Sequence, residues 1–187
     1  MRRIKIGDVF CTKVPSGYKI YQWAYRVDRK GDYIRVFDGL YDSIPSSLEE
    51  IVNGPHSYIL AFRITMAYRK GLSVFLGNFP VPPEYPFPEY QLGFFFSSAD
   101  QQLLSIHVMN SDQRQHMNKI YKAGKITDLP EKFQKITLIN SFRDFSLILY
   151  MFDVGFDLQH IERFYVGGGP EWDAILKKYI DILDALE

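Results

Sequence analysis

Between Tyr18 and Val27 the chain alternates apolar and polar residues with a period of two, which is typical of a β-strand. One of the two faces is clearly the more apolar, and we expect it to lie toward the core. This face carries Lys19, Tyr21, Trp23, Tyr25 and Val27.

Turn residues divide the first half of the chain into short runs rich in strand-forming residues. The turn Pro15–Gly17 and the loop Asp28–Gly31 flank the alternating run, and this arrangement predicts consecutive antiparallel hairpins. The runs that predict strands are Val9–Val14, Tyr18–Val27, Tyr33–Phe37, Tyr58–Met66, Leu72–Leu76, Leu92–Ser97, Leu103–Met109 and Gln134–Ile139.

After Asn140 the apolar period changes from two to three or four residues, which predicts helices. One helix is expected from a Ser141 cap to near Gly155, and another over 170–186, where Pro170 suits the first turn. A shorter helix is expected over 46–52, because Ser followed by Glu three residues later is a capping box. Residues 157–164 suggest a further turn of helix, and 110–132 are compatible with a polar helix from Ser111 but specify no element.

The segment 79–90, FPVPPEYPFPEY, has five prolines in twelve residues, so neither a helix nor a central strand is expected there. An extended, polyproline-like connection is predicted instead. Large aromatic side chains on a stiff backbone lose little entropy on binding, which suits a partner interface. The alternative is that they cover one end of the core. The partner-binding candidates are Tyr85, Phe87, Glu89 and Tyr90.

Together these patterns predict an α+β fold. A curled, barrel-like antiparallel sheet is expected from the N-terminal half, with helices mainly in the C-terminal third. The length of 187 residues suits a single domain, with 1–109 mostly β and 140–187 mostly helical and packed on the sheet.

Charge and hydropathy narrow the possible partners. Lys and Arg together number 22, as do Asp and Glu, so the chain lacks the basic excess usual in binders of nucleic acid or anionic membranes. The hairpin does alternate aromatic residues with basic ones, which keeps a single-stranded nucleic-acid module open as an alternative. The basic residues are Lys19, Arg26, Arg29, Lys30 and Arg35. The sequence contains neither a signal peptide nor an apolar run long enough for a membrane span, so a cytoplasmic protein is expected.

Residues able to perform catalysis are few. The single cysteine, Cys11, lies in an apolar strand, and the four histidines show no metal-ligand spacing. Gly167–Gly169 precede a helix but lack the Lys and Ser or Thr of a phosphate loop. We therefore expect no catalytic residue, metal or cofactor, and the residues specify no oligomeric state. A small hydrolase using Cys11 or a histidine remains the alternative.

The opening block resembles the Imm26-type immunity proteins of bacterial polymorphic-toxin systems. The similar residues are Gly7–Phe10, the turn at 15–17, the aromatic strand Tyr18–Val27, and Phe75–Pro80 with the prolines that follow. The resemblance covers roughly residues 4–95. It implies a non-enzymatic protein that binds and neutralises a cognate toxin domain, and it carries over no catalytic residue.

Overall fold

Nine β-strands form one sheet in the computed structural model, in the order β5-β1-β2-β3-β4-β9-β6-β7-β8. The structure describes residues 2–27, 31–96, 104–110, 119–123, 126–136, 138–139, 145–155 and 170–186. The strands are β1 Asp8–Val14, β2 Gly17–Val27, β3 Gly31–Phe37, β4 His56–Ala61, β5 Val74–Asn78, β6 Tyr90–Phe96, β7 Leu104–Asn110, β8 Lys119–Ala123 and β9 Leu138–Ile139.

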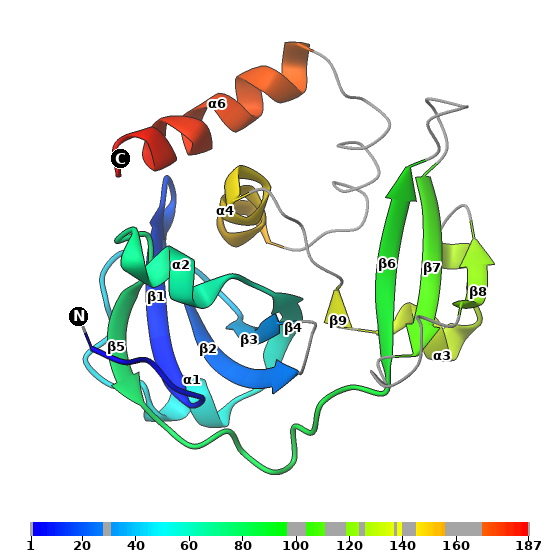
Figure 1. The fold of residues 1–187 in the computed structure, drawn as a ribbon, viewed down its shortest axis with the longest axis horizontal. Coiled ribbons are helices and arrows are strands. Elements are labelled where there is room, and N and C mark those ends of the chain that lie inside the picture. Colours follow the sequence, from blue (N-terminus) through cyan, green and yellow to red (C-terminus); the bar gives the residue numbers. More distant parts are fainter. Residues whose placement is uncertain are drawn as a thin grey trace.

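The N-terminal half supplies five of these strands, and their pairings with one another are all antiparallel. The sheet curls without closing into a barrel, as twisted strands with irregular register tend to do (Figure 1). The predicted fold class is therefore confirmed, including the curled antiparallel sheet of the N-terminal half.

A two-residue strand, β9, joins the two parts of the sheet. It pairs in parallel with β4 on one side and with β6 on the other. The strands β6, β7 and β8 are antiparallel to one another and build a second, smaller core. Its buried residues are Leu92, Val108, Ala123, Leu129 and Phe133.

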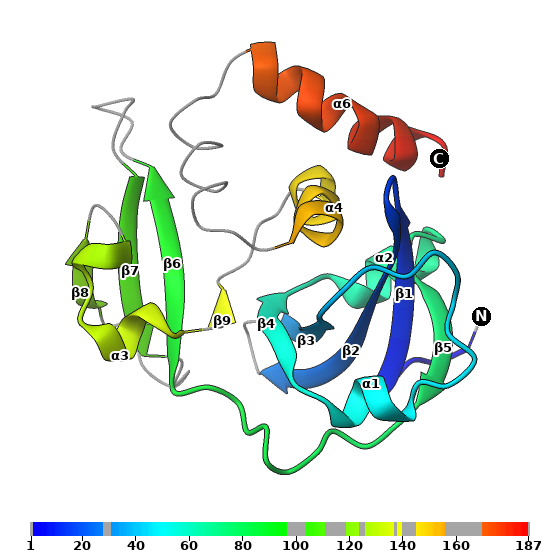
Figure 2. The same cartoon turned by 180° about the vertical axis from the view of Figure 1, so that it is seen from behind.

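Most of the helical residues follow the sheet in the sequence. Helices α4 (Phe145–Val154) and α6 (Pro170–Asp184) lie on one side of the five-stranded sheet, with α4 in contact with both β1 and β2 (Figure 2). Figure 2 shows α1 (Glu49–Asn53) and the segment between β5 and β6 on the other side. The remaining helices are α2 (Ile64–Arg69), the 3₁₀ turn η1 (Ile126–Asp128) and α3 (Glu131–Gln134).

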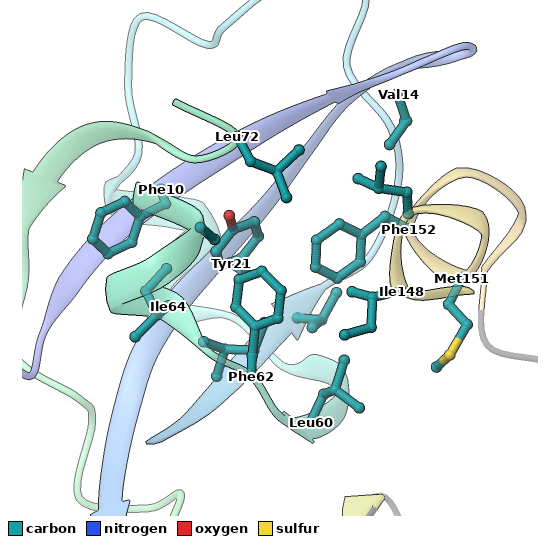
Figure 3. Packing of buried hydrophobic residues seen from close by; sticks show 14 of the residues in the cluster. Phe10, Val14, Tyr21, Leu60, Phe62, Ile64, Leu72, Ile148, Met151 and Phe152 are labelled. Atoms are coloured by element: carbon teal, nitrogen blue, oxygen red, sulfur yellow. The ribbon is translucent and has the colours of Figure 1, made fainter. Parts of the chain in front are cut away.

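The main core lies between the sheet, α2 and α4. Tyr21 sits near its centre, with ring centroids 5.6 Å from Phe62 and 5.1 Å from Phe152 (Figure 3). The Tyr21 hydroxyl is held by Thr12 at 2.7 Å and by Ser73 at 2.6 Å, so the polar end of this buried ring is satisfied. Burial raises the pKa of Tyr21 above its ordinary value.

The opposite face of the sheet is buried as well. It packs Val9, Cys11 and Ile20 against Val52 of α1. The register shifts between Trp23 and Tyr25, so Tyr25 lies opposite Tyr33 and joins this second face. The expectation that Tyr25 shares a face with Trp23 was wrong, because a bulge reverses the alternation of side chains.

Three predicted elements differ from the structure. The run 58–66 ends as a strand at Ala61, and α2 begins at Ile64, where burial of Ile64 and Ala67 outweighs the strand preference of the sequence. Helix α1 begins at Glu49, with Leu48 as N-cap and no side-chain capping bond, so the predicted capping box is not formed. The run Gln134–Ile139 divides between α3 and β9.

Other predicted ranges are only partly described. Within 110–132 the structure has a strand, β8, at 119–123, where a continuing polar helix was one option. Helix α4 starts at Phe145, and the proposed Ser141 cap lies outside the described residues. The range 157–164 lies outside them too.

Gly7 connects three strands at a position where only glycine fits. Its amide donates to the Trp23 carbonyl at 2.8 Å, and its carbonyl accepts from the Phe79 amide at 2.9 Å. Its φ is +93°, and an added Cβ would meet the Phe79 oxygen at 2.6 Å. Both the backbone conformation and the space therefore exclude a side chain.

We expect Gly7→Ala to lower the free energy of unfolding by about 2 kcal/mol, from left-handed strain together with displacement of the Phe79 backbone. Gly39→Ala is the matched control, because φ is +76° there but nothing lies within 4 Å of the added Cβ. Urea unfolding of both variants measures the difference. Equal losses in the two would show that the close approach at Phe79 has no cost.

Candidate functional site

The proline segment, residues 79–90, runs between β5 and β6 along one side of the sheet (Figure 1). It contains no helix, and its only strand residue is Tyr90, which begins β6. The absence of a helix and of a strand before Tyr90 agrees with the prediction, but the segment is not extended throughout, because the Tyr85 amide donates to the Pro82 carbonyl at 3.1 Å and closes a turn. What the sequence left open is where its aromatic side chains lie.

Tyr85 packs over the guanidinium of Arg35, with 4.3 Å between the ring centroid and the guanidinium carbon. The His56 ring meets it edge-on, with centroids 5.3 Å apart. The Tyr25 hydroxyl donates a hydrogen bond to the Tyr85 carbonyl at 2.5 Å. Both the ring and the backbone of Tyr85 are thus fixed, and the side chain remains only half-buried.

Phe87 lies against the same sheet, with centroids 5.2 Å from Tyr25 and 5.1 Å from Tyr33. Tyr90 instead contacts Phe133 of the second core, with centroids 5.4 Å apart. Glu89 is exposed and accepts a hydrogen bond from the Tyr90 hydroxyl, which raises the pKa of Tyr90. The four partner-binding candidates therefore line one extended segment that spans both parts of the sheet.

Arg35, below Tyr85, is fully buried. Its Nη1 donates to Gln22 Oε1 at 3.1 Å and its Nη2 to the Gly54 carbonyl at 3.0 Å. A longer bond of 3.4 Å joins Nη1 to the Val52 carbonyl at the end of α1. No carboxylate among the described residues lies within ion-pair distance of Arg35.

Burial lowers the pKa of Arg35, and the nearby Tyr25, Tyr85 and Glu84 partly offset this effect. An arginine keeps its charge in such surroundings, so carbonyl dipoles and the Tyr85 ring balance the buried cation. Arg35 thereby connects β3, α1 and the proline segment.

Within the described residues, the surroundings of Cys11 and His56 do not favour the chemistry of a Cys–His hydrolase. Cys11 is 1% exposed, and burial raises the pKa of its thiol to about 11. His56 accepts a hydrogen bond at Nδ1 from Arg35 Nε at 3.4 Å, and burial together with Arg35 lowers its pKa to about 4. A base needs a pKa near the working pH, so this neutral imidazole is a poor one.

Two of the other histidines, His116 and His160, lie outside the described residues, as does the glycine run 167–169. His107 belongs to β7. Within the part of the chain that the structure describes, no three His, Cys, Asp or Glu residues are grouped so as to hold a metal ion.

Cys11 is expected to resist a water-soluble disulfide reagent in the folded protein at pH 8, because thiolate formation and access are both suppressed. The same thiol should react fully and quickly in 6 M guanidinium. The measurement is release of the coloured leaving group with and without denaturant. Rapid reaction of the native protein would instead support a nucleophilic role for Cys11.

Among the described residues of the N-terminal hairpin, Lys19, Arg26 and Arg35 do not form one exposed surface, and Arg29 and Lys30 lie outside the described residues. Lys19 is 4% exposed and Arg35 is fully buried. Arg26 is exposed but paired with Asp32 at 2.8 Å, and it also stacks on Trp23. Stacking platforms for single strands need accessible cations beside accessible rings, and this arrangement does not favour them.

A polar cavity of about 350 Å³ opens beside the ends of β3 and α4. Its polar lining comes from Lys19, Asp38, Ser57 and Asp153. The Ser57 hydroxyl donates to Asp38, and Lys19 Nζ donates to the Gly39 carbonyl at 3.0 Å. Sequence reasoning did not identify this site, although a lysine within the apolar face of β2 is the signal that points to it.

An apolar groove of about 440 Å³ lies between the C-terminal end of α6 and the β1–β2 turn. Its walls include Val14, Leu72 and Ile182, with Val74 51% exposed at its edge. The groove borders the hairpin formed by β1 and β2.

Neither a protein-family model nor a curated protein nor a solved structure matches this chain. Among the described residues, no helix has the length and apolar character needed to cross a membrane. The function is therefore inferred from the residues and their geometry.

Proposed function

We propose that the protein is a non-catalytic binding protein that neutralises a cognate bacterial toxin in the cytoplasm, as an immunity protein. The observation that carries this proposal is the fixed, partly exposed proline segment. A rigid segment that already holds its aromatic side chains in place loses little conformational entropy when a partner binds.

The contacts of Tyr85 and Phe87 explain this rigidity. Tyr85 is held from below by Arg35 and through its carbonyl by Tyr25, while Phe87 packs between Tyr25 and Tyr33. Both residues are half-buried, so part of each remains accessible to a partner. Aromatic anchors of this kind commonly dominate binding energy at protein interfaces.

The outward side of the segment is acidic. Glu84 and Glu89 are exposed, and Pro83 and Pro86 are exposed beside them. No ion pair joins either carboxylate to a cation within the described residues. Two accessible carboxylates on a rigid backbone favour a partner with a basic surface, because complementary charge speeds encounter and fixes orientation.

The alternatives use side chains that have other roles in this fold. A hydrolase would need Cys11, which is buried, or His56, which is bound to Arg35. A nucleic-acid module would need the hairpin cations, of which Lys19 and Arg35 are buried. These contacts favour a binding role for the protein over either alternative.

The decisive experiment searches the host genome beside this gene for a toxin domain and tests each candidate found there. Isothermal titration with the purified toxin domain should give a specific complex, and the double variant Glu84→Gln/Glu89→Gln should bind roughly tenfold more weakly at low salt. The difference should shrink as salt rises. Asp173→Asn/Asp181→Asn removes two exposed carboxylates from α6 and serves as the matched control.

Two outcomes would overturn the proposal. One is the absence of a toxin gene nearby together with no binding to any candidate toxin domain. The other is a toxin complex whose affinity falls equally in the α6 control and in the Glu84/Glu89 variant. That result would exclude the proline segment as the interface.

A further inference from the structure

We propose that the cavity beside β3 and α4 binds a small zwitterion with an apolar body, of the free α-amino acid class. In this proposal Lys19 binds the ligand carboxylate and Asp38 binds the ligand ammonium. The assignment rests on the charges and hydrogen bonds of the cavity and is independent of the toxin-binding proposal.

Lys19 supplies the first observation. Lys19 is only 4% exposed, and it lines the cavity. An ammonium group has three N–H donors, and the described residues provide one acceptor, the Gly39 carbonyl at 3.0 Å. A carboxylate that enters the cavity can therefore form both an ion pair and hydrogen bonds with Lys19.

The two carboxylates of the cavity differ in what they offer. Asp153 is already engaged, since Oδ1 accepts from the Ser16 amide at 2.9 Å and Oδ2 from the Tyr179 hydroxyl at 2.7 Å. Lys178 lies 3.6 Å from the same Oδ2. Asp38 is exposed and receives one hydrogen bond, from Ser57, so it has room for a cationic donor.

The cavity therefore has a cation at its buried end and an open carboxylate at its exposed end. Once Asp153 is balanced by Lys178, the charges of Lys19 and Asp38 sum to zero. The two groups form no ion pair, although Asp38 is close enough to oppose the lowering of the Lys19 pKa by burial. A ligand with net charge zero and separated charges matches this pattern, with its carboxylate inward and its ammonium outward. An anion or a cation alone would leave one of the two protein charges unmatched.

Size and lining select the body of the ligand. A cavity of about 350 Å³ suits a single small molecule. Its apolar wall includes Leu40 and Val154, and Val154 is 43% exposed at the opening. An aliphatic side chain of about the size of leucine would cover this wall.

The test compares three probes by isothermal titration in an amine-free buffer: leucine, 4-methylpentanoate and 3-methylbutylamine. All three share the aliphatic body. Leucine carries both charges, 4-methylpentanoate carries only the carboxylate, and 3-methylbutylamine carries only the ammonium. Leucine is expected to bind at least about tenfold more tightly than either of the others.

Variants then assign the two ends of the ligand. Lys19→Met should weaken leucine at least about tenfold, and Asp38→Asn should do the same while leaving 4-methylpentanoate within about twofold. Lys177→Met, an exposed lysine of α6 that does not line the cavity, is the control and should leave all affinities unchanged.

Asp38 is exposed, so Asp38→Asn decides the question even where Lys19→Met fails to fold. Three results would overturn the proposal. They are no leucine binding at millimolar concentration, equal binding of leucine and 4-methylpentanoate, and leucine binding that Asp38→Asn leaves unchanged.

Discussion

Replacing Arg35 by alanine is expected to lower the free energy of unfolding by about 4 kcal/mol, the largest single effect expected in this fold. The substitution empties a fully buried position and removes the donors that satisfy Gln22 Oε1 and the Gly54 carbonyl. It also removes the cation beneath the Tyr85 ring. Lost packing and unsatisfied buried acceptors therefore act in the same direction.

Urea unfolding of matched variants separates these causes. Arg35→Met restores most of the volume but no donor, and Arg35→Lys restores the charge but not the planar fork, so both should fall between the wild type and Arg35→Ala. Arg26→Ala is the control at an exposed position, with 55% side-chain exposure, and should cost less than about 1 kcal/mol. A loss at Arg35 no larger than at Arg26 would contradict the structural role.

Arg35→Lys also connects stability to the proposed function. Because the Tyr85 ring lies over the guanidinium, the lysine variant should loosen the proline segment while leaving Glu84 and Glu89 in place. Weaker toxin binding by a folded Arg35→Lys variant would show that rigidity of the segment contributes to affinity. Unchanged affinity would show that the exposed carboxylates suffice.

Replacing Asp153 by alanine should lower the free energy of unfolding by about 3 kcal/mol. Asp153 is 7% exposed and lies near the end of α4, where its carboxylate holds Ser16 of the β1–β2 turn and Tyr179 of α6. Tyr179 is fully buried, and its hydroxyl would lose its hydrogen-bond acceptor. One carboxylate thus joins three elements distant in the sequence.

A set of smaller changes apportions the effect. Tyr179→Phe removes one donor and should cost about 1 kcal/mol, whereas Lys178→Met removes a half-exposed cation 3.6 Å away and should cost less. The double variant Asp153→Ala/Tyr179→Phe should be less destabilising than the sum of the single variants, because the orphaned hydroxyl is then absent. Strict additivity would indicate that the 2.7 Å contact carries no coupling.

The Asp153 contribution should depend on pH with a defined sign. Burial raises the pKa of Asp153, but hydrogen bonds from Tyr179 and Ser16 together with Lys178 outweigh it, so the pKa lies below its ordinary value. A carboxyl with a lowered folded-state pKa stabilises the fold above its unfolded-state pKa, near about 4, and this stability is lost as pH falls through the folded-state pKa. The difference between wild type and Asp153→Asn should therefore shrink below about pH 4. A constant difference from pH 6 to pH 2 would contradict this.

Short sequence patterns predicted those elements whose conformation depends mainly on residues adjacent in the sequence. Alternation located β1, β2 and β3, helical spacing located α6, and proline density located the segment without helix or strand before β6. The strand preference of Ile64–Met66 misled, because these residues form a helix that buries Ile64 and Ala67 on the core. The bulge after Trp23 was not predicted either, because the alternation of apolar and polar residues does not indicate an inserted residue.

The sequence by itself determined an α+β fold, a curled antiparallel sheet and a stiff aromatic connection, because periodicity and proline act over a few residues. Only the tertiary structure decided that Tyr85 covers a buried arginine, that Asp153 joins α4 to α6, and that Lys19 ends in a polar cavity. The partners in such contacts lie far apart along the chain, with Asp153 and Ser16 separated by 137 residues. Their roles depend on burial and on distant acceptors, and these exist only once the chain has folded.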